Sequence, residues 1–349
     1  MPLLAPSRPT LLKATFHSLV VFDGFLTNNL GTLVPSFIPP PSSTLNWRYF
    51  RSLATRTMQI PTLPLKDGNA VPMLGFGTGT TWYKNNPEDP LSLQLVELLK
   101  AALAQGYAHI DTADSYGTER EVGLAIQQSS ISREKLFITT KVQDGWEDVP
   151  AALDASLERL RLEYVDLYLL HNPYVIGSNE GIQAAWKGLE IVKAQGKAKS
   201  IGISNFQRHH IETLLQTCTI KPVMNQLEFH PYLQRANDFV PWMREHDIEV
   251  SSFKSLAPIT VGKGGPLDEL LPSLAGKYKV TESVVLLSWC IGQNISPITT
   301  TSSQSRLDEY STATEVVLEP ADVEEITQAG LKYHFRWWGK YFFEPDDRS

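Results

Sequence analysis

Four side chains that can take part in proton transfer follow three apolar segments of the chain. Asp111 and Tyr116 follow the first segment, Lys141 ends the second, and His171 ends the third. A tyrosine with an ordinary pKa near ~10 is a weak acid at neutral pH, and a nearby ammonium lowers its pKa by stabilising the phenolate. A carboxylate keeps the lysine charged, and a histidine can orient a substrate oxygen. Together the four predict a proton donor beside a carbonyl oxygen.

This set of residues lacks a nucleophile–base pair for acyl transfer, and the sequence predicts no metal site. A proton donor beside a carbonyl needs a source of hydride, which side chains cannot supply, so we expect a cofactor. Each residue also has an ordinary structural interpretation, because a lysine at a strand end commonly reaches for solvent and an aspartate commonly caps a helix. Three consecutive strands that end in this way favour the catalytic interpretation.

The elements that must position these residues are short strands alternating with helices. Eight apolar segments have strand character, at residues 73–78, 108–113, 136–141, 165–171, 200–204, 223–229, 249–253 and 295–299. Apolar residues at helical spacing lie between them, in the sets Val96, Leu99 and Leu103, then Leu153, Leu157 and Leu160, then Ile182, Trp186 and Leu189. Gly106 and Gly196 are typical of helix ends.

Alternation of strands and helices predicts parallel pairing with right-handed crossovers. Eight such units in fewer than 300 residues predict an α/β fold of the (β/α)8 TIM barrel type, in which strand C-terminal ends carry the chemistry. A doubly wound open sheet is the alternative, but the segment Gly75-Phe76-Gly77-Thr78-Gly79 lacks the final glycine of a dinucleotide-binding loop. Residues 63–73, with Asp67-Gly68 at their turn, predict a β-hairpin before the barrel.

The first 57 residues differ in composition from the rest. They contain five arginines or lysines, one acid, and the run Ile38-Pro39-Pro40-Pro41. This composition is typical of an organelle transit segment. The alternatives are a disordered tail and a gene model that starts too early, and we favour these two over a transit segment. We therefore expect residues 1–57 to be an extension and residues 58–349 to be the barrel domain.

Composition excludes several classes of protein. With 349 residues, 42% hydrophobic and 20% charged, the chain is typical of a globular protein. A net charge of -7 disfavours nucleic acid as a partner, and no apolar run is long enough to cross a membrane. Cys218 and Cys290 fit a reducing compartment and form no zinc motif. We expect a cytoplasmic protein, or a mitochondrial one if residues 1–57 are a transit segment.

Six motifs in order resemble those of the aldo-keto reductases and cover residues 63–333. They are Gly75-Phe76-Gly77-Thr78, His109-Ile110-Asp111-Thr112-Ala113 with Tyr116, Thr140-Lys141-Val142, Val165-Asp166-Leu167-Tyr168-Leu169-Leu170-His171, Ile201-Gly202-Ile203-Ser204-Asn205-Phe206, and Asn225-Gln226-Leu227-Glu228-Phe229-His230-Pro231. The resemblance implies a catalytic tetrad of Asp111, Tyr116, Lys141 and His171, with Tyr116 as the general acid. It is greatest for fungal-type members that reduce α-keto amides.

The resemblance also implies a nicotinamide cofactor across the barrel mouth. Ser204, Asn205 and Gln226 correspond to the residues that hold its carboxamide, and Phe253 stands where the family usually has a tyrosine stacked on the ring. Leu256 belongs to the same implied site. An N-cap for the next helix is the alternative role of Ser204 and Asn205.

One departure from the family pattern concerns the cofactor phosphate. Members that prefer NADPH often have a Lys-Ser pair after the last strand, and here the run is Thr299-Thr300-Thr301-Ser302-Ser303 with Arg306 following. The hydroxyls of Thr300 and Thr301 can donate hydrogen bonds, Arg306 can bind a phosphate, and a helix starting near Ser303 adds N-terminal donors. We expect NADPH, with NADH as an alternative.

Trp82, Trp146 and Asn172 are expected to line the substrate pocket, although ordinary loop packing is the alternative for Trp82. The aromatic tail around Trp337 and Trp338 is expected to fold over the barrel mouth, or else to pack against the barrel side. An apolar pocket would suit hydrophobic aldehydes and ketones rather than sugars.

We therefore expect a monomeric or homodimeric NADPH-dependent reductase of small carbonyl substrates. The alternatives are a regulatory subunit that binds the cofactor with little turnover, and an isomerase or hydrolase on the same barrel, which would need no cofactor consumption.

Overall fold

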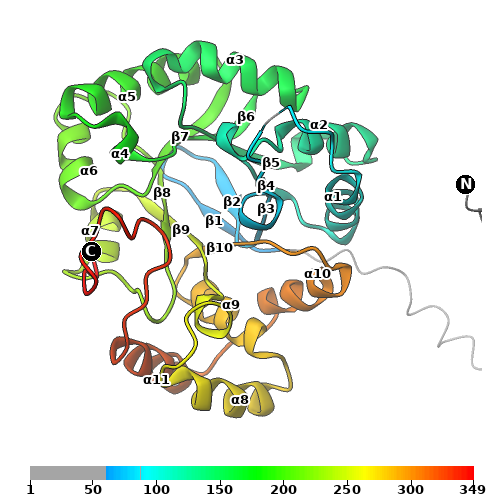
Figure 1. The fold of residues 1–349 in the computed structure, drawn as a ribbon, viewed down its shortest axis with the longest axis vertical. Helices are drawn as coiled ribbons and strands as arrows, with labels where there is room; N and C mark the ends of the chain where they lie inside the picture. Colours follow the sequence, from blue (N-terminus) through cyan, green and yellow to red (C-terminus); the bar gives the residue numbers. More distant parts are fainter. Residues whose placement is uncertain (1–59, 87) are drawn as a thin grey trace, which may run out of the picture. The chain divides into compact units, whose positions relative to one another are not determined.

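Eight parallel strands close into a barrel in the computed structural model, which describes residues 60–86 and 88–349 (Figure 1). The predicted extension, residues 1–57, lies outside the described residues. The barrel strands are β3 (Gly75–Gly77), β4 (His109–Asp111), β5 (Phe137–Val142), β6 (Val165–Leu170), β7 (Ala198–Ser204), β8 (Met224–Glu228), β9 (Glu249–Phe253) and β10 (Ser296–Thr299).

The strand order confirms the predicted (β/α)8 barrel and excludes the open sheet. Each strand pairs with the next in the sequence, and the last strand returns to the first, with Ile298 level with Gly75. All eight predicted strands are present. The first is shorter than predicted, three residues instead of six.

Helices surround the strands on the outside (Figure 1). They are α1 (Leu93–Gln105), α2 (Glu119–Gln128), α3 (Val149–Leu160), α4 (Pro173–Ile176), α5 (Asn179–Ala194), α6 (Arg208–Leu215), α7 (Phe239–Glu245), α8 (Leu267–Tyr278), α9 (Glu282–Gly292), α10 (Gln304–Ser311) and α11 (Pro320–Leu331). The three helices predicted from apolar spacing are α1, α3 and α5. None of the helices among the described residues is long and apolar enough to cross a membrane.

Local sequence signals set the ends of these helices. The Ser92 hydroxyl accepts a hydrogen bond from the Leu95 amide at the start of α1. At the other end, Gly106 adopts a φ of 107°, a left-handed conformation that favours glycine, and its amide donates to the last carbonyls of α1. Trp186 of α5 and Trp289 of α9 are buried beneath the helix layer. The helices therefore pack on the barrel through their apolar faces.

The predicted hairpin closes the N-terminal end of the barrel. Its strands β1 (Thr62–Pro64) and β2 (Ala70–Pro72) pair antiparallel around a turn containing Gly68, whose φ is 89°. Val71 is buried in a core cluster with residues from the start of barrel strands, including Phe137 and Val223. The Ser296 hydroxyl of β10 also donates to the Pro72 carbonyl at 3.0 Å. The opposite end, where the strands finish, is the barrel mouth.

Candidate active site

The four predicted catalytic side chains meet at the barrel mouth. Asp111 is the last residue of β4, Lys141 is the fifth residue of β5, and His171 directly follows β6. Tyr116 ends the single 3-10 turn η3 (Asp114–Tyr116), just beyond β4. Neighbouring parallel strands finish at one edge of the sheet, so the strand arrangement brings together residues that are 60 positions apart in the sequence.

The Lys141 ammonium lies at the centre of this group. Its Nζ is 2.6 Å from Asp111 Oδ1, 2.8 Å from the Thr112 carbonyl oxygen and 3.4 Å from the Tyr116 hydroxyl. Both members of the Lys141–Asp111 ion pair are buried. The other carboxylate oxygen of Asp111 accepts a hydrogen bond from Gln226 Nε2 at 2.8 Å. A buried charge requires such complete pairing, because desolvation would otherwise neutralise it.

The Tyr116 hydroxyl lies between the lysine and the histidine. His171 Nε2 is 3.4 Å from it, the same distance as Lys141 Nζ. The tyrosine ring packs against Gly79, where a Cβ atom would lie 2.9 Å from the ring and clash. The half-buried carboxylate of Asp114 accepts hydrogen bonds from the amides of Ser115 and Gln143, so it joins the loop that carries Tyr116 to the loop after β5.

Burial decides the protonation state of the tyrosine. It raises the pKa of Tyr116, while Lys141 acts in the opposite direction, and the net shift is upward. The lowering expected from Lys141 is present, but desolvation outweighs it, so the pKa of Tyr116 stays above its usual value. Tyr116 is protonated at neutral pH, which is the form that can donate a proton.

The two basic groups beside Tyr116 are shifted in opposite directions. Burial lowers the pKa of Lys141, but the charges and hydrogen bonds of Asp111 and Tyr116 together raise it by more, and the net shift is upward. Burial, followed by the charge of Lys141, holds the pKa of His171 well below its usual value. The site therefore contains a charged lysine and a neutral histidine at neutral pH, so His171 can act as a neutral hydrogen-bonding group.

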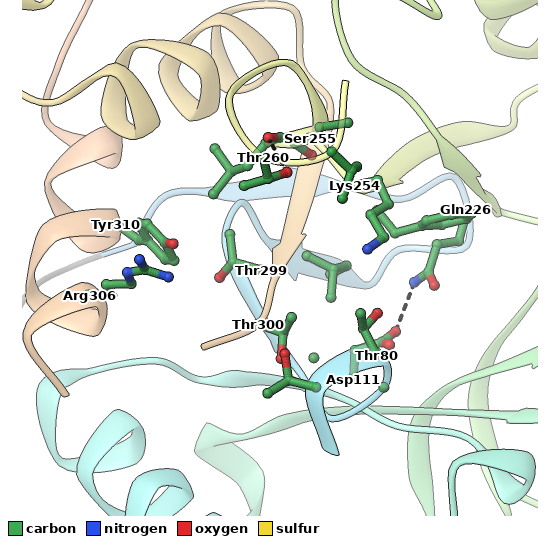
Figure 2. A pocket seen from close by; sticks show the side chains of 18 of the residues that line it. Thr80, Asp111, Gln226, Lys254, Ser255, Thr260, Thr299, Thr300, Arg306 and Tyr310 are labelled. Carbon is green, nitrogen blue, oxygen red and sulfur yellow. Dashed lines mark hydrogen bonds between the residues drawn. The ribbon is translucent and has the colours of Figure 1, made fainter. Parts of the chain in front are cut away.

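A first cavity of ≈ 260 Å³ extends from the tetrad toward α10 (Figure 2). Five of the predicted cofactor residues line it: Gln226, Phe253, Leu256, Thr300 and Arg306. Several polar lining residues were not predicted from the sequence, among them Thr80, Lys254 and Tyr310. Figure 2 shows Lys254 and Arg306 at opposite sides of the cavity, with Thr299 and Thr300 between them. This is an elongated groove with a cation on either side.

Buried polar atoms without partners test whether this region fits a nicotinamide cofactor. Asn205 Oδ1 is buried and has no hydrogen-bond partner among the described residues, while Asn205 Nδ2 donates to the His171 carbonyl at 3.0 Å. Asn205 has a φ of 64°, an unusual left-handed conformation for a residue other than glycine. A carboxamide NH2 group is a suitable donor for such an oxygen. The residues therefore fit the cofactor.

Ser204 and Gln226 lie beside this asparagine. Ser204 Oγ donates to the Gln226 carbonyl at 2.9 Å and accepts from Asn205 Nδ2 at 3.0 Å. The alternative role of Ser204 and Asn205 as a helix N-cap is wrong, because α6 begins after Gln207, which caps it.

The two predicted threonines differ in position. Thr300 lines the groove, and its buried hydroxyl has no partner among the described residues. Thr301 is buried, is absent from the groove lining, and accepts a hydrogen bond from the Ser303 amide through Oγ1 at 3.0 Å. The helix expected near Ser303 is α10, which begins at Gln304.

A second cavity of ≈ 410 Å³ is lined by Tyr116 and His171. Its lining includes Tyr83, Trp337 and Trp338, so the C-terminal tail covers part of the mouth as predicted. Tyr116, Gln226 and Phe253 line both cavities, as does Thr80. The two cavities therefore adjoin at the tetrad, and a ligand in one would contact a ligand in the other.

The residues predicted to line the substrate pocket are not part of this lining. Trp82 Nε1 donates to the Thr301 carbonyl at 3.1 Å, and the Trp146 ring packs near Gly181 at the start of α5. Asn172 Oδ1 caps α4 by accepting from the Tyr174 amide at 2.9 Å. Loop residues took these structural roles because strand alternation does not determine where their side chains point. A substrate-binding role for them stays a prediction.

Sequence comparison places this geometry in a known family. The model of the Aldo/keto reductase family matches residues 73–330, the part of the chain that contains all eight barrel strands. The chain belongs to the aldo/keto reductase family. As a member of this family it is an oxidoreductase of aldehyde and ketone carbonyls. The family match also covers Asp111, Tyr116, Lys141 and His171.

Two fungal aldo/keto reductases are similar over most of the chain. The NAD/NADP-dependent indole-3-acetaldehyde reductase of Schizosaccharomyces pombe is 37% identical over 279 residues, which are 79% of this chain and 98% of the relative. The NADPH-dependent alpha-keto amide reductase of Saccharomyces cerevisiae is 36% identical over 296 residues, covering 79% of this chain and 95% of the relative. Neither comparison supports the alternative of a regulatory subunit.

Solved aldo/keto reductases share the fold. An enzyme from Brucella melitensis is 33% identical with a TM-score of 0.69, covering 78% of this chain and 100% of the other. A silkworm (Bombyx mori) aldo-keto reductase solved in complex with NADP is 30% identical with a TM-score of 0.69, covering 77% of this chain and 92% of the other.

Proposed function

We propose that this aldo/keto reductase reduces neutral aldehydes and ketones with NADPH and that Tyr116 donates the proton. One observation carries the proposal. The Tyr116 hydroxyl lies 3.4 Å from both Lys141 Nζ and His171 Nε2, and it faces a cavity bounded by aromatic side chains. A protonated phenol between a buried ammonium and a neutral imidazole is equipped to donate to a carbonyl oxygen.

Each member of the tetrad has a defined task in this proposal. Lys141 stabilises the phenolate that remains on Tyr116 after proton donation, because its ammonium is desolvated and held close. Asp111 keeps Lys141 charged and aimed through the 2.6 Å ion pair. His171, neutral in the free protein, hydrogen-bonds the substrate oxygen and fixes its position relative to Tyr116.

The groove beside the tetrad is proposed to hold the cofactor. Arg306 offers a guanidinium for the 2′-phosphate in this groove, and Phe253, which lines both cavities, offers an aromatic face for the nicotinamide ring. Asn205 lines the second cavity, where it adjoins the groove, and its Oδ1 would accept from the carboxamide. Arg306 is exposed and forms no ion pair with any described residue, so it is free to bind an anion. When bound, the reduced nicotinamide supplies the hydride.

The second cavity supports neutral substrates with apolar substituents. Its lining contains five aromatic rings besides His171, together with uncharged polar side chains that include Gln143 and Asn205, and no Asp, Glu, Lys or Arg. The five rings belong to Tyr83, Tyr116, Phe253, Trp337 and Trp338. An uncharged wall gives a substrate carboxylate no partner to offset its desolvation. The aldehyde and α-keto amide substrates in the names of the two fungal relatives are also neutral.

The first experiment is NADPH consumption by the purified full-length chain with indole-3-acetaldehyde and methylglyoxal. We expect turnover, and we expect Tyr116→Phe to lower kcat by about 10²–10⁴-fold, the usual contribution of a general acid. NADPH binding without turnover on any carbonyl would instead support the regulatory alternative. Turnover that survives in Tyr116→Phe would exclude Tyr116 as the donor.

A matched pair of substrates tests the preference for neutral carbonyls. An α-keto amide and the corresponding α-keto acid differ in charge but hardly in size. We expect kcat/KM to be at least about tenfold higher for the amide, because one unpaired buried charge costs more than 1.4 kcal/mol. Equal values would contradict the assignment of the uncharged cavity as the substrate site.

We also propose that the chain is a monomer or a homodimer and that it is located in the cytoplasm. Light scattering coupled to size-exclusion chromatography would measure the mass. Imaging of full-length protein against a variant that lacks residues 1–57 would test whether that segment directs the protein to mitochondria.

A further inference from the structure

Two backbone amides of the C-terminal tail point at one buried carboxylate. The Trp337 amide donates to Glu228 Oε1 at 2.7 Å, and the Trp338 amide donates to Glu228 Oε2 at 2.7 Å. Glu228 is fully buried, and 109 residues separate it from Trp337 in the sequence. Hydrogen bonds to an ionised acceptor are short and strong, and here each carboxylate oxygen receives one from the tail.

The position of Glu228 follows from the alternation of side chains along β8. Gln226 and Glu228 are two residues apart, so both face the same side of the strand. Gln226 contacts Asp111 of the tetrad, and Glu228, one step nearer the mouth, contacts the tail. His230 Nε2 lies 3.1 Å from Glu228 Oε1 and adds a third neighbour. Burial raises the pKa of Glu228, but these hydrogen bonds outweigh it and hold the pKa below its usual value.

The ring of Trp337 is held from the adjacent strand. Lys254 Nζ lies 3.8 Å from the centre of the Trp337 indole, a cation–π contact. Lys254 directly follows Phe253, which is level with Glu228 in the pairing of β8 and β9. Two neighbouring strand ends therefore hold the same tail residue, one by its main chain and the other by its ring.

The tail needs these contacts because residues 332–349 form no helix or strand. Its amides therefore have no regular hydrogen-bond ladder to hold them. Trp337 and Trp338 nevertheless form a wall of the second cavity, which Tyr116 and His171 also line. The position of this wall depends on acceptors supplied by the barrel.

We propose that Glu228 is a positioning residue that sets selectivity for large aromatic substrates by fixing the Trp337–Trp338 wall. The inference rests on the proposed function, because it assigns the second cavity to the carbonyl substrate. Glu228 does not line either cavity, so its effect on a substrate must pass through the two tryptophans. A small dicarbonyl compound that does not reach the wall should not depend on it.

The direct test is hydrogen–deuterium exchange of the full-length chain and its Glu228→Gln variant. The amide side chain keeps the size of the carboxylate but loses its charge and one acceptor oxygen. We expect exchange at the Trp337 and Trp338 amides to become at least about tenfold faster in the variant. Glu249→Gln, at the opposite end of the neighbouring strand β9, is the matched control and should leave both amides unchanged.

Steady-state kinetics test the consequence for substrates. We expect Glu228→Gln to raise KM for indole-3-acetaldehyde about tenfold with kcat nearly unchanged, and to leave methylglyoxal kinetics unchanged. Trp337→Ala should have the same effect, and the double variant should be no worse than either single variant, because both changes remove one wall. Additive effects would show that Glu228 acts by another route.

The outcomes separate this inference from the proposed function. Unchanged exchange at both tail amides in a folded Glu228→Gln variant would overturn the inference even if the enzyme reduces carbonyls. Faster exchange with unchanged KM for the aromatic aldehyde would also overturn it. If no carbonyl is reduced by the wild-type chain, the proposed function fails, while the exchange experiment still tests the contact. Should Glu228→Gln fail to fold, Glu228→Asp, which keeps the charge but is one methylene shorter, replaces it.

Discussion

Lys141 Nζ lies 2.6 Å from Asp111 Oδ1 with both side chains buried, and this ion pair joins two strands at the centre of the active site. The pair is also adjacent to the Tyr116 hydroxyl, 3.4 Å from Lys141. An interaction of this kind serves stability and chemistry together, because removal of either partner leaves an uncompensated charge in a dry site.

Replacement of Asp111 by asparagine should therefore destabilise the fold as well as lower activity. We expect Asp111→Asn to lower the free energy of unfolding by ~3–5 kcal/mol, the usual cost of breaking a buried pair. Asp154→Asn is the control, since Asp154 pairs with Lys197 on the surface and should cost less than ~1 kcal/mol. Urea unfolding of both variants measures the difference. Equal effects would mean that the buried pair contributes no more than an exposed one.

Stability should decrease as the pH falls from 7 toward 4. Burial lowers the pKa of His109 and of His210 to about 4, and that of His171 well below 6.5. Between the unfolded and folded pKa values of a histidine, the unfolded state binds more protons, so stability rises with pH. Each such histidine can contribute a slope of at most ~1.4 kcal/mol per pH unit.

One carboxyl group opposes this trend. Burial raises the pKa of Asp114 to about 6, so the folded state binds a proton at Asp114 before the unfolded state does. The contribution of Asp114 to the stability of the protein therefore increases as the pH falls. The three histidines outnumber it, and the net change should still be a loss. Urea unfolding at pH 7 and 5 tests the sign, and a His109→Gln variant should have a smaller slope. A net gain at pH 5 would contradict the assignment of neutral buried histidines.

Arg306 should distinguish the two nicotinamide cofactors. Its guanidinium is the cation on the α10 side of the groove, far from Gln226 (Figure 2). If it binds the 2′-phosphate, Arg306→Ala should weaken NADPH binding about ten- to hundredfold and leave NADH binding nearly unchanged. Fluorescence titration of both cofactors measures the ratio. A parallel loss for NADPH and NADH would place Arg306 on a group that the two share.

Lys254 should give the complementary result. It lines the groove on the other side from Arg306 and forms no ion pair with the described residues. A cation in that place is near groups common to NADPH and NADH, so Lys254→Met should weaken both by a similar factor of about ten and reduce the salt dependence of binding. Lys263→Met, on an exposed lysine of the following loop, is the control and should change neither. Selective loss of NADPH would contradict this prediction.

Strand periodicity explains why most of the tetrad site could be predicted from the sequence. Asp111, Lys141 and His171 end consecutive apolar segments, and parallel strands bring such ends together whatever the loops do. Gln226 and Phe253 follow the same logic. The role of Glu228 could not be predicted in this way, because its partners are tail amides whose positions depend on the path of the tail.

The direction of loop side chains is harder to predict from a sequence, for a physical reason. Trp82 and Trp146 lie in 3-10 turns after strands, where the side-chain direction depends on local hydrogen bonds and packing rather than on alternation. The protonation of Tyr116 was also beyond the sequence, because the pKa depends on how far burial outweighs the Lys141 charge, and burial is a property of the folded state.

The hairpin of β1 and β2 covers the end of the barrel that lies opposite the mouth. Val71 and its neighbours pack against the starts of the barrel strands, whereas the tetrad and both ligand cavities lie at the opposite end. Because the hairpin lies away from the reacting groups, substitutions in it can change the stability of the fold without changing substrate selectivity.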